Sequence, residues 1–400
     1  MTDSSPDDGI SRLRPRIGLF VQPTAVWASK VLPGILRVAL EETSWELIHS
    51  GYTADTERLF EVFRIFEADG VIGFLGSAVN VRRMPASVRA VVNISNRLAN
   101  PPVPSVLNDD VAAGHLAADH LLAAGFHHLA YYGYPGEHFS RLRRRGLVER
   151  ANARRVRAHV FRSPHDPYTR WDHWLHDVAR WMRRLPDRTG ILASDDGHAT
   201  DLLNLASKAG RAIPAELGVM GVNNDSSIRS FLDGISLSSV ELDYPTVGIR
   251  AARLLQRILG GERIPRRHRE LVAPIGVVVR SSTDRRFAEG PVVGRAVQLI
   301  ESDIAHPWRV DELAGAVHVS RRMLERQFAA ALGHSPKEEI DAIRLRHARS
   351  LLVDPAHTIS EIAAACGFDE PRGLTLLFRR RLGLTPSGVR AQLQKAAKAR

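Results

Sequence analysis

An internal repeat in the last hundred residues restricts the fold most strongly, because two similar segments are expected to adopt similar structures. The first copy covers residues 312–336 and the second covers 361–386. The copies are offset by 49 residues at their start and by 50 from Leu324 and Leu374 onward, so the second copy has one extra residue in its turn. Each copy has the pattern of a helix, a tight turn and a second helix.

Within each copy, residue types recur where a helix-turn-helix needs them. A small buried residue precedes the turn, a polar residue caps the second helix, two apolar residues four apart face the core, and a glycine ends the helix. In the two copies these are Val317 and Cys366, Ser320 and Asp369, Leu324/Phe328 and Leu374/Phe378, and Gly333 and Gly383. This recurrence disfavours the alternative of a plain helical bundle with solvated arginines.

The outward face of each second helix is basic, which favours a polyanionic partner. An arginine side chain can bind the edge of a guanine through two hydrogen bonds, or a phosphate through one. We expect the two helices to enter successive major grooves on one face of double-stranded DNA, ~34 Å apart. The expected DNA contacts are Ser320, Arg321, Arg322, Glu325 and Arg326 in the first copy, and Arg372, Thr375 and Arg379 in the second, with Arg380 also facing outward.

The segment 292–393 resembles the AraC/XylS-type DNA-binding domain. The resemblance is carried by the runs 358–363, 366–368, 378–380 and 383–386 and by Arg390. It implies a transcription factor, more often an activator. Gly373-Leu374 and Gly388-Val389 depart from the family pattern, which usually has an aromatic or polar residue before the core leucine and a Glu-Tyr pair before the arginine. Gly373 lowers helix propensity by ~1 kcal/mol relative to alanine, so we expect a looser second recognition helix or weaker base contacts.

Before the repeat, short apolar runs alternate with amphipathic helical patterns from residue 16 to about residue 260. This alternation predicts parallel sheets covered by helices on both faces, and the number of elements favours two doubly wound lobes. The predicted fold is therefore α/β for this part of the chain, followed by an all-α domain with two helix-turn-helix units. Small ligands bind beyond the carboxyl ends of such strands. The residues at those places are Trp27, Asn93, Asn108, Gly133, Asp195, Asp196, Asn223 and Asn224.

Residues 15–285 resemble the effector domain of LacI/GalR-type repressors, which is related to periplasmic sugar-binding proteins. The matching runs include 106–110, 114–121, 193–196, 218–224 and 278–283. A sensor followed by an AraC-type domain resembles the bacterial xylose operon regulators. The resemblance implies homodimers and a sugar held between two lobes. Carried over by position, it assigns Arg143, Asp196 and Asn223 as polar ligands and Trp27 as an aromatic ligand.

The carried-over ligand set has departures and alternatives. Ala28 stands where a polar residue is expected and Asn223 where aspartate is usual. The resemblance favours a pentose such as xylose, and these departures leave open a different sugar or a derivative. Trp27 could instead cover the sheet edge, and Asp196 or Asn223 could cap helices. Arg143 lies in a basic run and could belong to a solvated face.

Length and composition support this organisation. The 400-residue chain carries a formal net charge of +11 and one cysteine, Cys366, which we expect in a core. No signal-peptide pattern and no apolar window long enough to span a membrane is found, so we expect a cytoplasmic protein. The expected divisions are a disordered N-terminus (1–15), the sensor (16–283), a linker (284–291), the DNA-binding domain (292–393, with helix-turn-helix units at about 310–331 and 359–382) and a basic tail (394–400).

The predicted function is a sequence-specific, DNA-binding transcription regulator controlled by a small sugar, with RNA polymerase as a candidate further partner. The alternative is a cytoplasmic carbohydrate-binding protein without a regulatory role. An enzyme is disfavoured because no catalytic constellation is evident. No cofactor and no metal are expected, since the histidine-rich stretch has no ligand pair at a known spacing. That stretch contains His165, Asp166, Asp172, His173 and His176.

Overall fold

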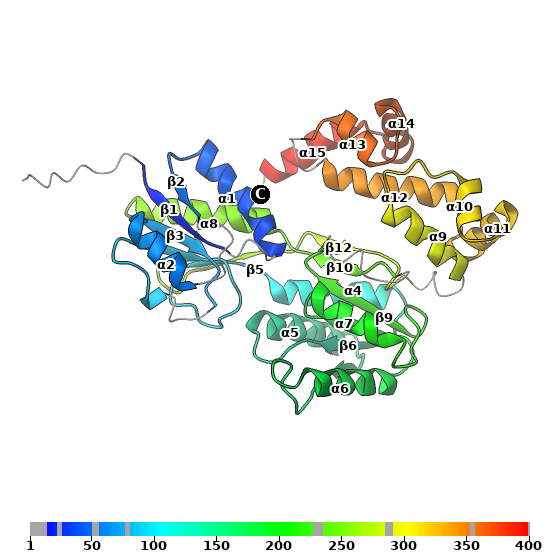
Figure 1. Ribbon diagram of the computed structural model, residues 1–400, viewed down its shortest axis with the longest axis horizontal. Helices are drawn as coiled ribbons and strands as arrows, with labels where there is room; N and C mark the ends of the chain where they lie inside the picture. The colour runs from blue at the N-terminus through cyan, green and yellow to red at the C-terminus, as the bar shows by residue number, and fades with distance from the viewer. Residues whose placement is uncertain are drawn as a thin grey trace, which may run out of the picture.

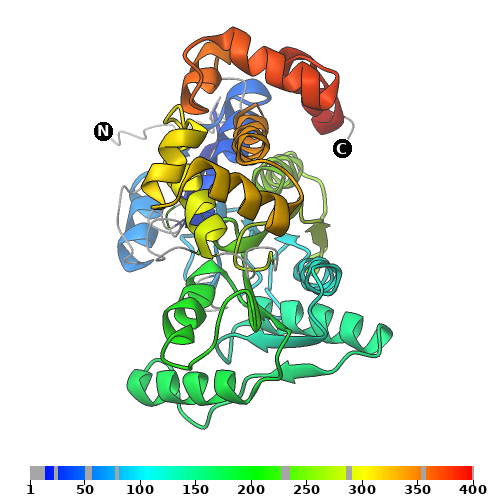
Figure 2. The same ribbon diagram turned by 90° about the vertical axis from the view of Figure 1, so that its right-hand side faces the viewer.

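Two six-stranded sheets form the larger part of the molecule, and helices alone form the last quarter (Figure 1). The computed structural model describes residues 14–21, 26–49, 56–76, 81–225, 227, 235–284, 291–352 and 357–398. Most of the expected N-terminal tail and the expected linker therefore lie outside the described residues. Figure 1 shows the helices after Pro291 as a group set apart from the two lobes, and in Figure 2 the same group lies in front of them.

The first lobe is built on a wholly parallel sheet. Its strand order is β11 (Arg269–Val272), β5 (Ser105–Asn108), β4 (Ala90–Asn93), β3 (Gly70–Gly73), β1 (Arg16–Phe20) and β2 (Glu46–Ile48). Helices α1 (Val26–Glu41) and α8 (Tyr244–Leu259) pack on one face, where Ile17 and Leu19 point. Helix α2 (Thr56–Ile65) packs on the other face, against Phe20 and Val71. Alternate residues of one strand thus enter opposite cores.

The second lobe repeats this arrangement with one antiparallel edge. Its order is β12 (Gly276–Val278), β10 (Ser238–Glu241), β9 (Leu217–Val222), β8 (Thr189–Ala193), β6 (His128–Tyr132) and β7 (Ala158–Val160), with β12 antiparallel to β10. Helices α4 (Asp110–Ala123) and α5 (His138–Ala153) cover one face. Helices α6 (Trp171–Arg184) and α7 (Asp196–Ala206) cover the other. The predicted two-lobed α/β fold is confirmed.

The chain crosses between the lobes at three places. The crossings follow β5, β10 and β11, and each leads directly into an element of the other lobe. Because the lobes share no sheet, these short connections form a natural hinge between them. The carboxyl ends of the parallel strands, where ligand groups are expected, lie next to these crossings.

The helical part contains two small cores. Helices α9 (Pro291–Ser302), α10 (Val310–Ala316) and α11 (Arg321–Leu332) surround the first core, and α13 (Ile359–Ala365) and α14 (Pro371–Leu382) surround the second. Helix α12 (Pro336–Leu351) packs against helices of both groups, as Figure 1 shows. The last helix, α15 (Pro386–Lys398), continues beyond residue 393. Cys366 is fully buried in the second core, as predicted, and burial raises the pKa of its thiol to about 12.

Candidate functional site

The first helix-turn-helix unit consists of α10, a turn and α11. Ser320 begins α11 with extended backbone angles, and its hydroxyl oxygen accepts a hydrogen bond from the Met323 amide at 3.2 Å. The predicted N-cap is confirmed. Gly333 ends the helix in the left-handed conformation, with φ of 72°, which is also confirmed. The turn before Ser320 contains His318, whose φ of 57° is unusual for a residue with a side chain.

The second unit differs at the start of its second helix. Helix α13 begins with a capping box, in which the side chains of Thr358 and Glu361 each accept a hydrogen bond from the backbone N–H of the other residue. The prediction that Asp369 caps α14 is wrong, because Pro371 is the first helical residue and Glu370 is the N-cap. The extra residue in the turn moves the helix start by one position. Gly383 ends α14 with φ of 69°, as predicted.

Both second helices present the same pattern of buried and exposed residues. Leu324, Phe328, Leu374 and Phe378 are fully buried, which confirms the predicted core-facing stripe. The arginine side chains at positions 322, 326, 372 and 379 are exposed. Helices α11 and α14 therefore have the same rotational setting over their own cores, and each turns a basic face outward.

Two other arginines on this surface are held by carboxylates. Arg321 binds Glu325 at 2.9 Å and Asp311 of α10 at 3.1 Å, which braces α10 against α11. Arg380 forms an ion pair with Asp341 of α12, whose side chain is only 5% exposed. Thr375 donates its hydroxyl hydrogen to the Pro371 carbonyl oxygen at 3.1 Å. These contacts orient the helices, whereas Arg322, Arg326, Arg372 and Arg379 form no ion pair with any described residue.

Gly373, the family departure on α14, has a packing reason. A β-carbon at this position would lie 2.8 Å from Cδ1 of Phe368, whose ring is in turn 5.0 Å from the Arg344 guanidinium. The Phe368 ring therefore occupies the space that a side chain at position 373 would need. The glycine permits this close approach at the cost in helix propensity noted above.

In the sensor, Arg143 is buried and not part of a solvated face. Its side chain is 5% exposed, and Nε donates to Oδ1 of Asp110 at 2.7 Å. Its guanidinium also donates to the Ser194 carbonyl oxygen at the end of β8. The Asp110 carboxylate accepts from the Asn96 side chain of the other lobe at 2.6 Å. Arg143 thus holds a polar network at the junction of the lobes.

Asp196 is the first residue of α7, and the N-cap is its neighbour Asp195. The Asp196 carboxylate accepts from the Asp225 amide and from the Ser239 hydroxyl, both at 2.6 Å. The side chain is almost wholly buried, and this desolvation raises its pKa to about 7 despite the two hydrogen bonds. The cap alternative therefore applies to Asp195 and not to Asp196.

Asn223 follows β9 with φ of 108° and joins the two lobes. The Tyr244 hydroxyl, at the start of α8, donates to Oδ1 of Asn223 at 2.9 Å. The Lys30 ammonium, on α1, donates to the carbonyl oxygens of Asn223 and Asn224, the latter at 2.9 Å. Asn223 does not cap a helix. Through these contacts, Asn223 connects the end of β9 in one lobe to α1 and α8 of the other.

Trp27 lies at the start of α1 and is half-buried. Its ring stacks on Phe74, which follows β3, with centroids 4.5 Å apart and planes 25° from parallel. Both aromatic rings lie at the carboxyl edge of the first sheet. The packing on Phe74 fits the sheet-edge alternative and equally fixes the indole ring for contact with a ligand.

Of the other strand-end residues, some are structural and some have unsatisfied atoms. The side chain of Asn93 is fully buried and bonded to Ser95, Ser105 and Leu75. By contrast, Oδ1 of Asn108 and Oγ of Ser194 are buried and have no hydrogen-bond partner among the described residues. Buried polar atoms are rarely left unpaired, so these two oxygens suit the hydroxyl groups of a ligand.

Besides Asn96, sequence reasoning missed four residues that link the lobes. Lys30 and Tyr244 bind Asn223, and Arg97 forms an ion pair with Glu137 across the junction at 3.3 Å. None of the four follows an apolar strand directly. Only Lys30 could have been found from the sequence, because it lies three residues after the predicted ligand Trp27 and therefore on the same face of the helix.

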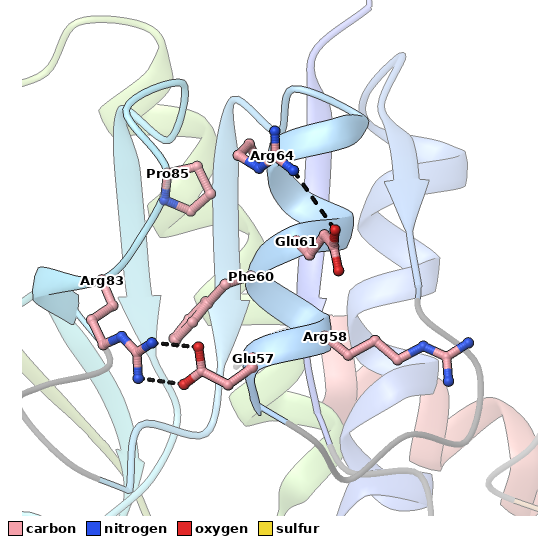
Figure 3. Close-up of a pocket in the computed structure, with 7 residues that line it drawn as sticks. All are labelled: Glu57, Arg58, Phe60, Glu61, Arg64, Arg83 and Pro85. Atoms are coloured by element: carbon pink, nitrogen blue, oxygen red, sulfur yellow. Dashed lines mark hydrogen bonds and ion pairs between the residues drawn. The ribbon is translucent and has the colours of Figure 1, made fainter.

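A hollow of 640 Å³ lies elsewhere, on the outer face of α2 (Figure 3). It is lined by Glu57, Arg58, Phe60, Glu61, Arg64, Arg83 and Pro85. Figure 3 shows Arg83 paired with Glu57 and Arg64 paired with Glu61. No predicted ligand residue lines this hollow. Four of its five charged side chains pair with each other, and it lies apart from the strand ends, so it is not a candidate for the predicted site.

The described part of the chain holds neither a metal-binding cluster nor a membrane-spanning helix. No three histidine, cysteine or acidic side chains gather there as a metal site would require. In the predicted histidine-rich stretch, His165 binds Asp177 at 2.8 Å. No described helix is long and apolar enough to cross a membrane.

Known proteins match both halves of the chain. A family model described as a periplasmic binding protein-like domain matches residues 118–283, and a helix-turn-helix domain model matches residues 313–392. The xylose operon regulatory protein of Escherichia coli strain K12 is 29% identical over 386 residues, which cover 94% of this chain and 97% of that protein. Its counterpart in Haemophilus influenzae is 25% identical over 385 residues, 94% of this chain and 98% of that protein. The solved structure of a xylose-binding transcription activator is 27% identical, with a TM-score of 0.60, and covers 94% of this chain and 98% of its own.

Proposed function

We propose that this chain, which joins a periplasmic-binding-protein-like sensor to an AraC-type helix-turn-helix domain, is a transcription regulator whose DNA binding is controlled by a small sugar. The observation that carries this function is the match of both domains, in the same order and over 94% of the chain, to regulators of xylose operons. We divide the chain into a sensor (16–283), a linker (284–291) and a DNA-binding domain (292–393). As a regulator of this kind it acts in the cytoplasm, as an activator and as a homodimer, with RNA polymerase as a further partner.

We assign a pentose such as xylose to the junction of the two lobes. The relative whose structure is known is a xylose-binding activator. Trp27 would pack on one face of the sugar, while Arg143, Asp196 and Asn223 form its polar surroundings. Asn108 and Ser194 add two buried oxygens that have no hydrogen-bond partner in the described part of the chain. Carboxylate, amide and guanidinium groups suit a polyol because they accept from or donate to hydroxyl groups in pairs.

Control of DNA binding would arise from the closure of the lobes. A sugar that contacts both lobes binds the closed form better, and only this difference in affinity can shift the equilibrium. The contacts of Lys30 and Tyr244 with Asn223 join the two lobes in this structure, and closure would preserve or strengthen them. Arg346 of α12 donates a hydrogen bond to the Val279 carbonyl oxygen of the sensor at 2.9 Å. This contact would transmit the lobe movement to the DNA-binding domain.

In the DNA-binding domain, we assign direct contacts to the exposed arginines. Arg322 and Arg326 of α11, and Arg372 and Arg379 of α14, are available for bases or phosphates. Ser320, Glu325 and Thr375 lie on the same surfaces and would contact the DNA beside them. Arg321 is braced by Asp311 and Glu325, so its role would be to orient α11 while contacting the backbone of the DNA.

The substitution Arg326→Ala tests the division of labour. We expect it to weaken operator binding by about 5- to 100-fold, the usual loss for a base-contacting arginine, and to leave the sugar-induced rise in melting temperature unchanged. Binding would be measured by fluorescence anisotropy at fixed salt, with the full-length chain. The matched control is Arg184→Ala, which removes an exposed arginine from the sensor helix α6.

Two results would contradict the proposal. If Arg326→Ala reduced sugar-induced stabilisation and DNA binding equally, the domains would not have separate roles. If the wild-type chain bound sugar but showed no salt-dependent preference for any promoter fragment, the chain would be a carbohydrate-binding protein without a regulatory role.

A further inference from the structure

An exposed leucine lies on the basic outer face of α14. Leu376 is 57% exposed, and it is the only large apolar residue exposed to this degree among the described side chains of α9 to α15. It follows Arg372 by four residues and precedes Arg379 by three, so the three side chains lie on one face of the helix. A single apolar residue between two cations is not the extended patch that a protein partner needs.

The internal repeat shows which residue of α11 takes the same place. The 50-residue offset pairs Leu374 with Leu324 and Phe378 with Phe328, and all four side chains are fully buried. The same offset pairs Leu376 with Arg326. Because both helices have the same rotational setting, an isobutyl group on α14 occupies the position that a guanidinium group occupies on α11.

These two groups read different features of a base pair. A guanidinium donates to O6 and N7 of guanine, whereas an isobutyl group neither donates nor accepts a hydrogen bond. The only apolar group that a base pair exposes in the major groove is the C5 methyl of thymine. Contact between that methyl and Leu376 removes apolar surface of both from water, which is favourable.

We propose that Leu376 reads a thymine methyl in the half-site bound by α14, at the place where Arg326 reads a guanine in the half-site bound by α11. The two half-sites of one operator therefore differ in sequence although the two reading units are repeats. The flanking Arg372 and Arg379 supply charge complementarity to DNA and hold the leucine against the groove. This inference rests on the proposed function, since it requires that α14 enters the major groove.

Deoxyuridine, which is thymidine without the C5 methyl, gives a direct test. The full-length chain would be used to select an operator duplex from a random pool. Each thymidine of that operator would then be replaced, one at a time, by deoxyuridine. For the wild-type chain we expect one replacement in the α14 half-site to weaken binding by about 3- to 5-fold, the loss for one buried methyl group. For Leu376→Ala we expect weaker binding to the unmodified operator and no further loss at that same thymine.

The matched control is Leu40→Ala, which truncates a leucine that is 82% exposed on α1 of the sensor. It should keep the wild-type response to every replacement. If the wild-type chain prefers its operator over random duplex, yet Leu376→Ala and wild type respond alike at every thymine, the inference is overturned while the proposed function stands. If Leu376→Ala binds DNA normally but reduces transcription, Leu376 contacts a protein and the inference is overturned. Failure of the wild-type chain to select any operator would overturn the proposed function and the inference together.

Discussion

At the scale of single residues, the two turns show how one backbone angle restricts the sequence. The 49-residue offset at the start of the repeat pairs His318 with Gly367, and both have positive φ, 57° and 71°. The second turn is tighter around this residue, because a β-carbon at position 367 would lie 2.8 Å from the carbonyl oxygens of Ile304 and His306. Glycine is therefore required in the second turn, whereas the exposed first turn accepts histidine at an energetic cost.

This difference predicts opposite effects of two substitutions. Gly367→Ala should lower the free energy of unfolding of the DNA-binding domain by more than about 2 kcal/mol, through positive φ and the clash with the two carbonyl oxygens. His318→Gly should raise it by up to about 1 kcal/mol. Relief of the left-handed strain stabilises the folded state, and the added entropy of the unfolded chain offsets only part of this gain. Scanning calorimetry of the full-length chain would measure both.

The control for these variants is Gly315→Ala, a helical position of α10 where a β-carbon meets no other atom. It should stabilise the domain slightly through helix propensity. Should Gly367→Ala melt at the wild-type temperature, the left-handed turn would not be needed for the fold.

At the scale of helices and strands, amphipathic helices and wholly apolar strands were predictable, and polar strands were not. The repeat predicted α10, α11, α13 and α14, since core spacing, caps and terminal glycines agree in both copies. Strands β10, β11 and β12 were not predicted. β10 begins Ser238-Ser239, whose hydroxyls donate to the Arg280 carbonyl oxygen and the Asp196 carboxylate, while β11 is an edge strand with Arg269 and Glu270. Their pairing partners, which are distant in the chain, stabilise them more than local pattern does.

The carboxylate that ties α7 to β10 gives a pH prediction. The pKa of Asp196 is about 7 in the folded chain, above its unfolded value of about 3.9. The folded state therefore holds this proton more tightly, so the stabilisation is complete below about pH 4 and is lost as the pH rises to about 7, by at most about 4 kcal/mol. We expect the melting temperature of the wild-type sensor to fall more between pH 5 and pH 8 than that of Asp196→Asn. Parallel melting curves for the two proteins would contradict this origin of the pKa.

At the scale of the whole molecule, the sites are partly visible in the sequence. The strand-end rule and the family resemblance pointed to Trp27, Asp196 and Asn223 because each lies in the segment or helix that comes next after a strand. The rule could not find Tyr244, Arg97 or Glu137, since their contacts depend on how one lobe approaches the other. It also could not show that Arg143 is buried, because its neighbours Arg144 and Arg145 are exposed and the local sequence is uniformly basic.

In the proposed function, the contacts that cross boundaries couple the sugar site to the DNA-binding domain. Lys30 and Tyr244 join the lobes at Asn223, and Arg346 joins the helical domain to the sensor at Val279. Under this proposal, a sugar that stabilises the lobe junction would change how the same molecule presents α11 and α14 to DNA. If these contacts couple the two sites, the free energy of coupling must be the same from either direction.

Isothermal titration calorimetry with the full-length chain tests this coupling most directly. The dissociation constant of xylose would be measured with and without saturating operator duplex, and that of the duplex with and without saturating xylose, at one salt concentration. We predict that each ligand tightens the binding of the other by the same factor, at least about 5-fold. If both ligands bind the chain and neither changes the affinity of the other, sugar does not control DNA binding in this protein.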